Sequence, residues 1–139
     1  MSGSVEGDIT VELHVPDFDA AVEFYDKLGF ALMSRQNGEL GYMVMRRSRS
    51  VIGFYGGSNK VYEHAYFQRY DTRTPRGYGV EIVIEVEEID EVFRAIKSLR
   101  SEAIVEELVE RPWGPRDFRL VDPFGFYLRI TEKINWLVP

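Results

Sequence analysis

The strongest constraint on the fold of this chain is a pattern that occurs twice, 71 positions apart. In each copy, alternating apolar and polar residues predict a half-buried strand, from Ile9 to Val15 and from Val80 to Val86. Apolar residues at helical spacing follow each strand: Phe18, Ala21, Val22, Tyr25 and Leu28 in the first copy, and Ile89, Val92, Phe93, Ile96 and Leu99 in the second. The shared phase of strand and helix indicates an internal duplication.

Local signals set the limits of the first helix and predict three strands after it. Asp17 is placed to cap the helix N-terminus, and Gly29 is placed to end it. Short strands are then expected at Phe30–Arg35, Tyr42–Arg46 and Ser50–Tyr55, and in the second copy near Ile104, at Arg116–Val121 and at Phe126–Thr131. The sequence therefore predicts an α+β fold built from two βαβββ modules in tandem.

The last of these strands form a hairpin that carries a large aromatic side chain near its mouth. Trp113 lies between Pro112 and Gly114, and the turn is expected at Asp122-Pro-Phe-Gly125. Two interpretations of Trp113 are open: a hydrophobic lid on the core, or a surface on which a flat ligand stacks. Arg116 and Asp117 beside it are expected to be solvated charges, with recognition of a carboxylate or phosphate as the alternative.

Composition limits the classes of function. With 139 residues, the chain is expected to form a single domain, and without cysteine it cannot form disulfides or zinc–thiolate sites. A net charge of −6 argues against a nucleic-acid partner. No run of 18 apolar residues occurs and Met1–Gly7 is not typical of a signal peptide, so we expect a cytoplasmic protein with no membrane partner.

Two segments do not belong to either module. The link from Gly56 to Gly79 is rich in tyrosine and arginine, and we expect it either to pack on the domain or a partner subunit or to contact a ligand. The tail Ile134–Val138 carries Trp136 and is expected to dock against the body or the other subunit. The expected organisation is thus a single domain over 1–139, with modules at 8–56 and 80–133, the link at 57–79 and the tail at 134–139.

Two motifs resemble the vicinal oxygen chelate superfamily, which includes glyoxalases, bleomycin-resistance proteins and dioxygenases. The first runs from Val15 to Phe30, and the second from Pro112 to Gly125, where the Trp-Gly and Asp-Pro-x-Gly elements are closest to the bleomycin-resistance branch. The resemblance covers about Ile9 to Glu132. It implies a curved mixed sheet that lines a cavity, with the helices outside, and a homodimer whose subunits together form ligand grooves.

The resemblance also allows the metal ligands of the enzymes in this superfamily to be carried over. The four positions fall on Thr10, Gly53, Glu81 and Arg129. Threonine and glycine supply no strong donor, and Arg129 brings a permanent cation. We therefore expect neither a metal nor another cofactor, and the substitutions argue against a metal-dependent enzyme.

Other roles for the polar residues of this cavity stay open. A displaced metal site would need both His14 and His64 together with a glutamate. Glu81 and Arg129 are expected to form a buried ion pair, or to anchor a ligand. Tyr42, Val51 and Tyr55 have the strand parity to line the cavity with Gly53, and Glu12 shares the parity of Thr10.

These expectations lead to three hypotheses on function. The first is a bleomycin-resistance-like protein that sequesters a flat, cationic ligand without chemistry, using Trp113, Tyr42, Tyr55, Glu81, Arg129, Glu12 and Val51. The second is a glyoxalase-like lyase or isomerase, or a dioxygenase relative, in which Glu12, His14 and Glu81 act as acid or base groups. The third is a ligand-sensing or assembly module without a role in drug resistance.

Overall fold

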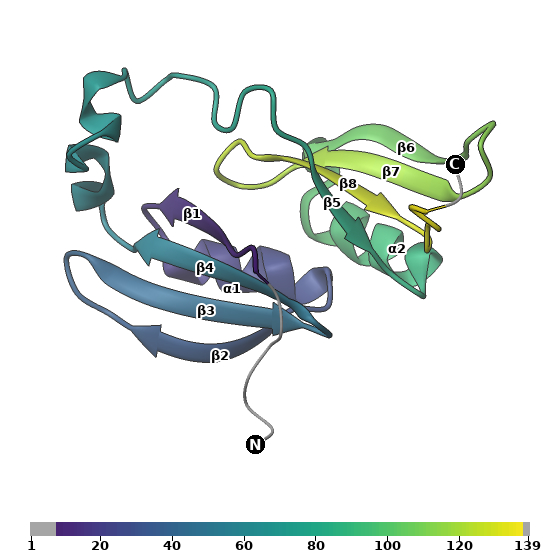
Figure 1. Ribbon diagram of the computed structural model, residues 1–139, viewed down its shortest axis with the longest axis horizontal. Coiled ribbons are helices and arrows are strands. Elements are labelled where there is room, and N and C mark those ends of the chain that lie inside the picture. Colours follow the sequence, from purple (N-terminus) through teal and green to yellow (C-terminus); the bar gives the residue numbers. More distant parts are fainter. Residues whose placement is uncertain (1–7, 138–139) are drawn as a thin grey trace. The chain divides into compact units, whose positions relative to one another are not determined.

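The computed structural model describes residues 8–137, which fall into two compact units, with the division of the chain between Thr74 and Pro75. Figure 1 shows a four-stranded sheet and one long helix in each unit. The first unit contains β1 (Val11–Val15), α1 (Phe18–Lys27), β2 (Ala31–Gln36), β3 (Gly41–Arg47), β4 (Ser50–Gly56) and the short helices η1 (Asn59–Glu63) and η2 (Phe67–Arg69). The second contains β5 (Ile82–Glu85), α2 (Ile89–Arg100), η3 (Ser101–Ala103), β6 (Ile104–Glu110), β7 (Arg116–Val121) and β8 (Tyr127–Thr131).

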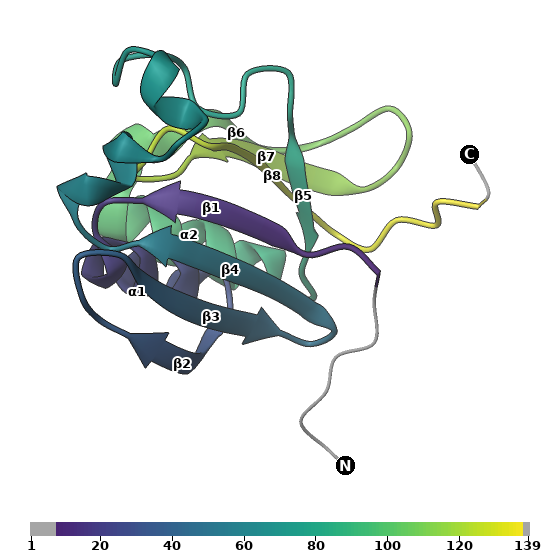
Figure 2. The same ribbon diagram turned by 60° about the vertical axis from the view of Figure 1, so that its left-hand side comes forward.

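The duplication predicted from the sequence is present at the level of topology. The strand order is β1-β4-β3-β2 in the first unit and β5-β8-β7-β6 in the second. In each, the first strand pairs in parallel with the last one, whereas the remaining pairs are antiparallel. Figure 2 shows β1 and β4 side by side and running in the same direction. The offset of 71 positions also holds, because β1 and β5 begin at Val11 and Ile82.

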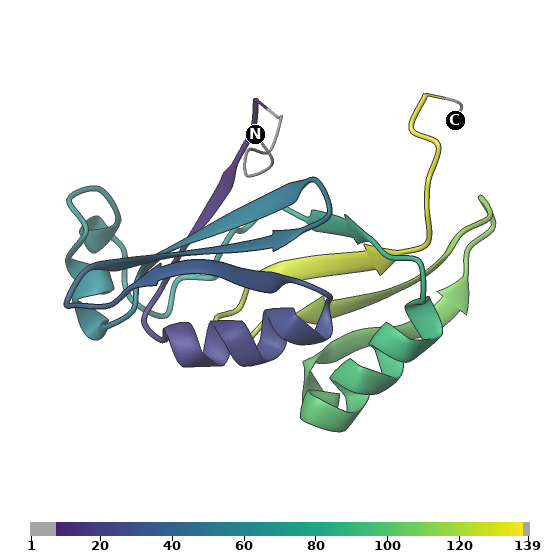
Figure 3. The ribbon, with the colours of Figure 1, turned by 90° about the horizontal axis from the view of Figure 1, so that it is seen from below.

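One face of each sheet is covered by the helix of its own unit (Figure 3). In the first unit, the ring centroids of Tyr25 on α1 and Phe54 on β4 are 5.3 Å apart, and both side chains are fully buried. In the second unit, Phe93 on α2 packs against Phe118 on β7 with centroids 5.0 Å apart. Because side chains alternate along a strand, the neighbours of these core residues lie on the opposite face of each sheet.

The local signals for helix α1 are confirmed. The Asp17 side chain accepts a hydrogen bond from the backbone N–H of Ala20 at 3.1 Å, as an N-cap does. Gly29 has a φ of +93°, the left-handed conformation that ends a helix at little cost when the residue is glycine. The helix also buries Phe24, which the predicted apolar stripe did not include.

The strands that open the two modules are shorter than predicted. Strand β1 begins at Val11, and Ile9 is exposed before it. Strand β5 begins at Ile82, and Val80 is 58% exposed instead of lying on the buried face. The backbone N–H of Val80 donates to the carbonyl of Gly77, so Val80 belongs to a turn and cannot extend the strand.

The β7–β8 hairpin turns where the sequence predicted it. Oδ1 of Asp122 accepts hydrogen bonds of 2.9 Å from the backbone N–H groups of Phe124 and Phe126. The Asp122 side chain is buried, and Gly125 has a φ of +98°, which favours glycine. A buried side chain therefore fixes the length of the turn, and with it the register of the hairpin.

We expect Asp122→Ala to lower the free energy of unfolding by about 1–3 kcal/mol, because it leaves two part-buried N–H donors without this acceptor. Asp122→Asn retains an oxygen in the same place and is expected to recover part of the loss. Urea denaturation followed by circular dichroism measures the change, with Asp26→Ala on the exposed side of α1 as the control. An Asp122→Ala protein as stable as the control would contradict this account of the turn.

Candidate functional site

A chain of polar groups lies on the face of the first sheet opposite α1. The hydroxyl group of Tyr42 on β3 donates to Oε1 of Glu12 on β1 at 2.9 Å. Oε2 of the same carboxylate lies 3.0 Å from Nε2 of His14. One carboxylate thus holds a phenol and an imidazole from two strands. Burial, together with the hydrogen bond to Glu12 and its negative charge, raises the pKa of Tyr42 above its ordinary value.

This arrangement depends on glycine at position 53. A Cβ atom built on Gly53 would overlap the hydroxyl oxygen of Tyr42, which crosses over the strand at this point. Gly53 pairs with Glu12 on one side and with Val44 on the other. Tyr42 reaches Glu12 across β4 because no side chain stands between them.

Aromatic side chains surround His14 on the same face. Its ring centroid lies 4.8 Å from Tyr55, 4.9 Å from His64 and 5.2 Å from Phe67. His64 and Phe67 belong to the link after β4, so this part of the link packs on the first unit. Nδ1 of His64 accepts from the backbone N–H groups of Tyr66 and Phe67. The exposed large aromatic side chains of the link are Tyr62, Tyr66, Phe67, Tyr70 and Tyr78.

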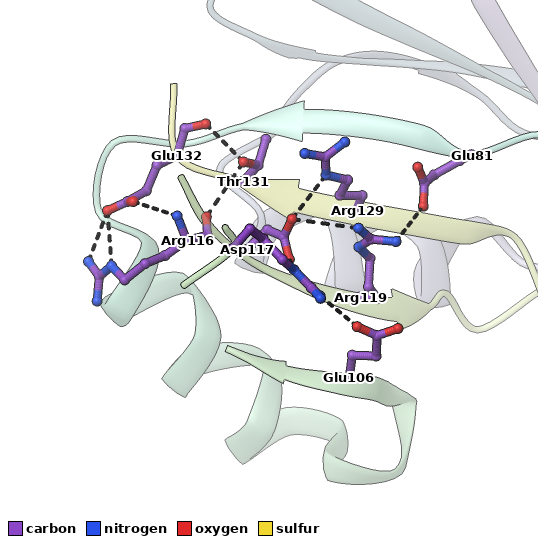
Figure 4. Close-up of polar contacts among 9 residues, drawn as sticks. Glu81, Glu106, Arg116, Asp117, Arg119, Arg129, Thr131 and Glu132 are labelled. Carbon is purple, nitrogen blue, oxygen red and sulfur yellow. Dashed lines mark hydrogen bonds and ion pairs between the residues drawn. The ribbon is translucent and has the colours of Figure 1, made fainter. Parts of the chain in front are cut away.

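The second sheet carries a charge cluster on the face opposite α2 (Figure 4). At its centre is the carboxylate of Asp117 on β7, which is fully buried. Its Oδ1 accepts from Nε of Arg111 at 2.7 Å, and its Oδ2 from Nε of Arg129 at 3.1 Å. Arg119 contributes a third guanidinium group, with Nη2 3.6 Å from Oδ2. A buried carboxylate needs such partners, because its removal from water is costly.

Two more carboxylates lie at the margin of this cluster. Glu106 on β6 accepts from Nη2 of Arg111 at 2.5 Å, and Glu81, just before β5, accepts from Nη1 of Arg119 at 3.1 Å. Both side chains are partly exposed to solvent. Burial acts to lower the pKa of Arg119, but the hydrogen bond to Tyr127 and the charges of Glu81 and Asp117 outweigh this effect and raise the pKa. Arg119 therefore stays charged.

Two predictions about these residues were wrong. Glu81 and Arg129 do not pair with each other: Glu81 pairs with Arg119, and Arg129 with Asp117. The reason is the strand register, in which Arg119 faces Arg129 and Asp117 faces Thr131, so Arg129 is a diagonal neighbour of Asp117. Asp117 was expected to be a solvated charge and is buried. The two-residue spacing from Asp117 to Arg119, on one strand of a hairpin, was a signal for this cluster that sequence reasoning missed.

Trp113 lies in the loop between β6 and β7 that begins at Arg111. A hydrogen bond of 3.0 Å from the N–H of Gly114 to the carbonyl of Arg111 closes the loop, and Gly114 has a φ of +119°. The Trp113 side chain is 60% exposed, so it is not a lid that covers the core. The guanidinium carbon of Arg111 lies 6.0 Å from its ring centroid. Because Arg111 also binds Asp117, the base of the loop is tied to the charge cluster.

Outside this cluster, Arg116 joins the first turn of α2 to the ends of β7 and β8. Its side chain donates hydrogen bonds of 3.0 and 3.1 Å to Asp90. It also donates hydrogen bonds of 3.0 and 3.1 Å to Glu132, and its backbone N–H donates to Glu132 at 2.8 Å. These hydrogen bonds lower the pKa of Glu132, the backbone N–H most, and the guanidinium of Arg116 lowers that of Asp90. Arg116 is a structural clamp.

In the tail, the indole N–H of Trp136 donates to Oε2 of Glu85 on β5 at 2.7 Å. This contact docks part of the tail against the second unit, one of the two expected outcomes, although the Trp136 side chain remains 60% exposed. The last residue of the predicted tail segment, Val138, lies outside the described residues, as does Met1–Gly7.

The side chains at the four positions carried over from metal enzymes do not fit a divalent cation. Tyr42 occupies the space beside Gly53, Glu81 is engaged by Arg119, and Arg129 presents a cation. His14 and His64 do come together, but as rings in an edge contact at an interplanar angle of 75°. Between residues 8 and 137, no group of three or more His, Asp or Glu side chains is placed to hold a metal ion.

The predicted ligand-binding residues thus lie on the helix-free faces of the two sheets and on one loop. Glu12 and Tyr42 are hydrogen-bonded, and Val51 and Tyr55 lie on the same face of the first sheet. Glu81 and Arg129 belong to the second sheet, where Arg119 and Asp117 connect them.

Known proteins share this fold. Residues 9–130 match the Glyoxalase/Bleomycin resistance protein/Dioxygenase superfamily. The chain is 24% identical over 132 residues to a bleomycin resistance protein of Klebsiella pneumoniae, a match that covers 89% of this chain and 90% of the relative. No helix in the described part of the chain is long and apolar enough to cross a membrane.

Solved structures of the same fold include a bleomycin-binding protein in complex with bleomycin, with a TM-score of 0.60 and 21% identity over 93% of this chain and 100% of the other. A protein of unknown function from Agrobacterium tumefaciens matches with a TM-score of 0.70 and 19% identity over 96% and 98% of the two chains. The two βαβββ units define an α+β protein of the glyoxalase and bleomycin-resistance fold. With the match over 9–130, the chain belongs to the Glyoxalase/Bleomycin resistance protein/Dioxygenase superfamily.

We expect Asp117→Ala to lower the free energy of unfolding by about 2–4 kcal/mol, because three guanidinium groups lose their shared carboxylate. Asp117→Asn, which keeps one acceptor oxygen, is expected to lose less. Urea denaturation measures both variants against Glu102→Ala, which removes an exposed carboxylate of the same unit. If Asp117→Ala matched this control, the cluster would have no stabilising role.

The Arg116 clamp predicts loss of stability in acid. Glu132 and Asp90 have folded-state pKa values below their ordinary values of 4.5 and 3.8, so the folded protein binds these protons less readily than the unfolded chain does. Their contribution to the free energy of unfolding is therefore complete at pH values above their ordinary pKa values. It is lost as the pH falls through their lowered folded-state pKa values. We expect Glu132→Gln to flatten the decline of the unfolding free energy below about pH 5, measured by urea denaturation in steps of pH. Parallel pH profiles for Glu132→Gln and the unaltered protein would contradict this.

Proposed function

We propose that this protein binds a flat, cationic small molecule and sequesters it without chemistry, in the manner of a bleomycin-resistance protein. The observation that carries the proposal is the Glu12 carboxylate, which is partly exposed and contacts Tyr42 and His14, with the ring of Tyr55 beside that of His14. A negative charge among aromatic rings suits a planar cation, which gains from stacking and from charge. The net charge of −6 favours the approach of such a ligand.

The ligand-contacting residues we propose are those expected from the sequence: Trp113, Tyr42, Tyr55, Glu81, Arg129, Glu12 and Val51. Trp113 supports this assignment because a tryptophan with most of its surface exposed, on a loop closed by a hydrogen bond, presents a flat face to an incoming ring. The relatives named as bleomycin resistance or bleomycin-binding proteins make bleomycin the first compound to test.

We also propose that the protein is a homodimer, with the ligand groove formed by both subunits, and that one domain spans the chain. Exposed apolar side chains on edge strands support a partner subunit. Strand β2 exposes Leu32 and Met33, and strand β6 exposes Val105 and Val109. Sedimentation equilibrium gives the mass directly, and a monomer at all concentrations would remove the dimer from the proposal. A cytoplasmic location is part of the same proposal.

The hydrogen-bonded chain Tyr42–Glu12–His14 favours a second candidate, a lyase or isomerase related to the glyoxalases. A phenol, a carboxylate and an imidazole in contact can transfer protons, and the pKa of Tyr42 is raised by burial and by the neighbouring carboxylate. This candidate differs from sequestration in one measurable respect: a bound compound would be converted, and Glu12→Gln would stop conversion while a planar ligand still bound.

Calorimetric titration of the metal-stripped protein with metal-free bleomycin tests the binding proposal. We expect saturable heat near one ligand per chain, and Trp113→Ala to weaken affinity about tenfold, the effect of losing a stacking side chain. Trp136→Ala is the matched control, because both tryptophans belong to the second unit and both are 60% exposed. Glu12→Gln is expected to weaken binding without unfolding the protein.

Two results would overturn the proposal. One is the absence of heat and of competition at high bleomycin concentration. The other is equal loss of affinity in Trp113→Ala and Trp136→Ala, which would mean that the effect is not local to the loop. Neither result would alter the fold or the family.

A further inference from the structure

Two arginines face each other on neighbouring strands of the second sheet, a placement that needs a physical reason. Arg119 on β7 is the direct partner of Arg129 on β8 in the antiparallel register. Both side chains extend over the face opposite α2, where Figure 4 shows their guanidinium groups beside the carboxylate of Asp117. Like charges directly opposite each other in a sheet are destabilising. Asp117 offsets part of this repulsion.

The carboxylates of the cluster do not accept hydrogen bonds from all of the guanidinium N–H groups. Asp117 is shared among Arg111, Arg119 and Arg129. Glu106 accepts a hydrogen bond from Arg111, and Glu81 accepts one from Arg119. Arg129 has Asp117 alone, and only through Nε. Within the described residues, its two Nη nitrogens have no hydrogen-bond partner, and the Nε of Arg119 is buried without one.

The two Nη nitrogens of Arg129 form a pair of donors along one edge of the guanidinium group. Asp117 binds Nε and thereby fixes the plane of the guanidinium group, so the edge formed by Nη1 and Nη2 points away from the carboxylate (Figure 4). The side chain as a whole is 13% exposed, and its outer edge has no acceptor among the described residues. Such an edge matches the two oxygens of a carboxylate or phosphate group.

We propose that Arg129, with Arg119 beside it, binds an oxyanion, the carboxylate or phosphate group of a small molecule. Asp117 positions Arg129 and is not displaced by the ligand. Glu81 and Glu106 lie at the margin and are partly solvated, so they neutralise the centre of the cluster only in part. The attraction for an anion is confined to this site, because the chain as a whole carries a net charge of −6 and repels anions.

This inference uses Arg129, which the proposed function also assigns to ligand contact, but it concerns a ligand group of the opposite charge and does not depend on sequestration of a cationic drug. It would remain if bleomycin failed to bind. If both proposals hold, the ligands of this protein include compounds that carry an acidic group beside a planar ring system.

Titration of the whole protein with inorganic phosphate and, separately, with benzoate tests the site, at constant ionic strength maintained with sodium chloride. Intrinsic tryptophan fluorescence and the melting temperature report binding. We expect a saturable response to at least one anion, and an affinity at least about tenfold weaker in Arg129→Gln, as expected for loss of a charge-assisted pair. Arg100→Gln, at the exposed end of α2, is the control and is expected to bind like the unaltered protein.

Arg129→Lys separates loss of the site from loss of the fold. It keeps a positive charge near Asp117 but lacks the second donor edge, so we expect it to fold, by circular dichroism, and to bind weakly. Stronger binding of benzoate would assign a planar carboxylate as the ligand group, and stronger binding of phosphate would assign a phosphate. No anion response beyond the effect of salt, or equal affinity in the unaltered protein and a folded Arg129→Lys or Arg129→Gln, would overturn the proposal.

Discussion

Each unit in the described part of the chain has one α-helix, and that α-helix covers only one face of its sheet. Because side chains alternate along a strand, a residue that faces the helix must be apolar, and its neighbour is free to be polar. Phe54 and Phe118 meet the helices, while Gly53 and Asp117 belong to the other faces. The polar chain at Glu12 and the charge cluster at Asp117 follow from this division, because charged groups on the face opposite the α-helix do not disturb the core.

On the second sheet, a single buried carboxylate determines where several cations lie. Asp117 contacts guanidinium groups from the start of a loop, from its own strand and from the next strand. A charge inside a protein is tolerated when opposite charges and hydrogen bonds replace water. The same contacts therefore stabilise the sheet, hold the base of the loop that carries Trp113, and fix the plane of Arg129.

Periodicity and end signals were sufficient to predict the order of strands and helices along the chain. The helices and the turn at Asp122 were evident because each depends on residues close together in the sequence, and the duplication was evident because one local pattern recurs 71 positions later. The ion-pair partners were not evident, since they depend on which residues of β7 and β8 lie side by side. The turn at Asp122 sets the register of β7 and β8, but which carboxylate each arginine reaches within that register depends on contacts between side chains, which no local pattern fixes.

The close approach of the Tyr42 hydroxyl group to Gly53 limits which substitutions this chain can accept during evolution. Any side chain at position 53 meets the hydroxyl group of Tyr42, so a metal ligand cannot be gained there while Tyr42 keeps its hydrogen bond to Glu12. The first step towards a metal site in the first unit would therefore disturb the existing polar chain before any cation could bind. A metal ligand at position 53 would need coupled replacements at positions 42 and 53, and single substitutions would pass through a less stable intermediate.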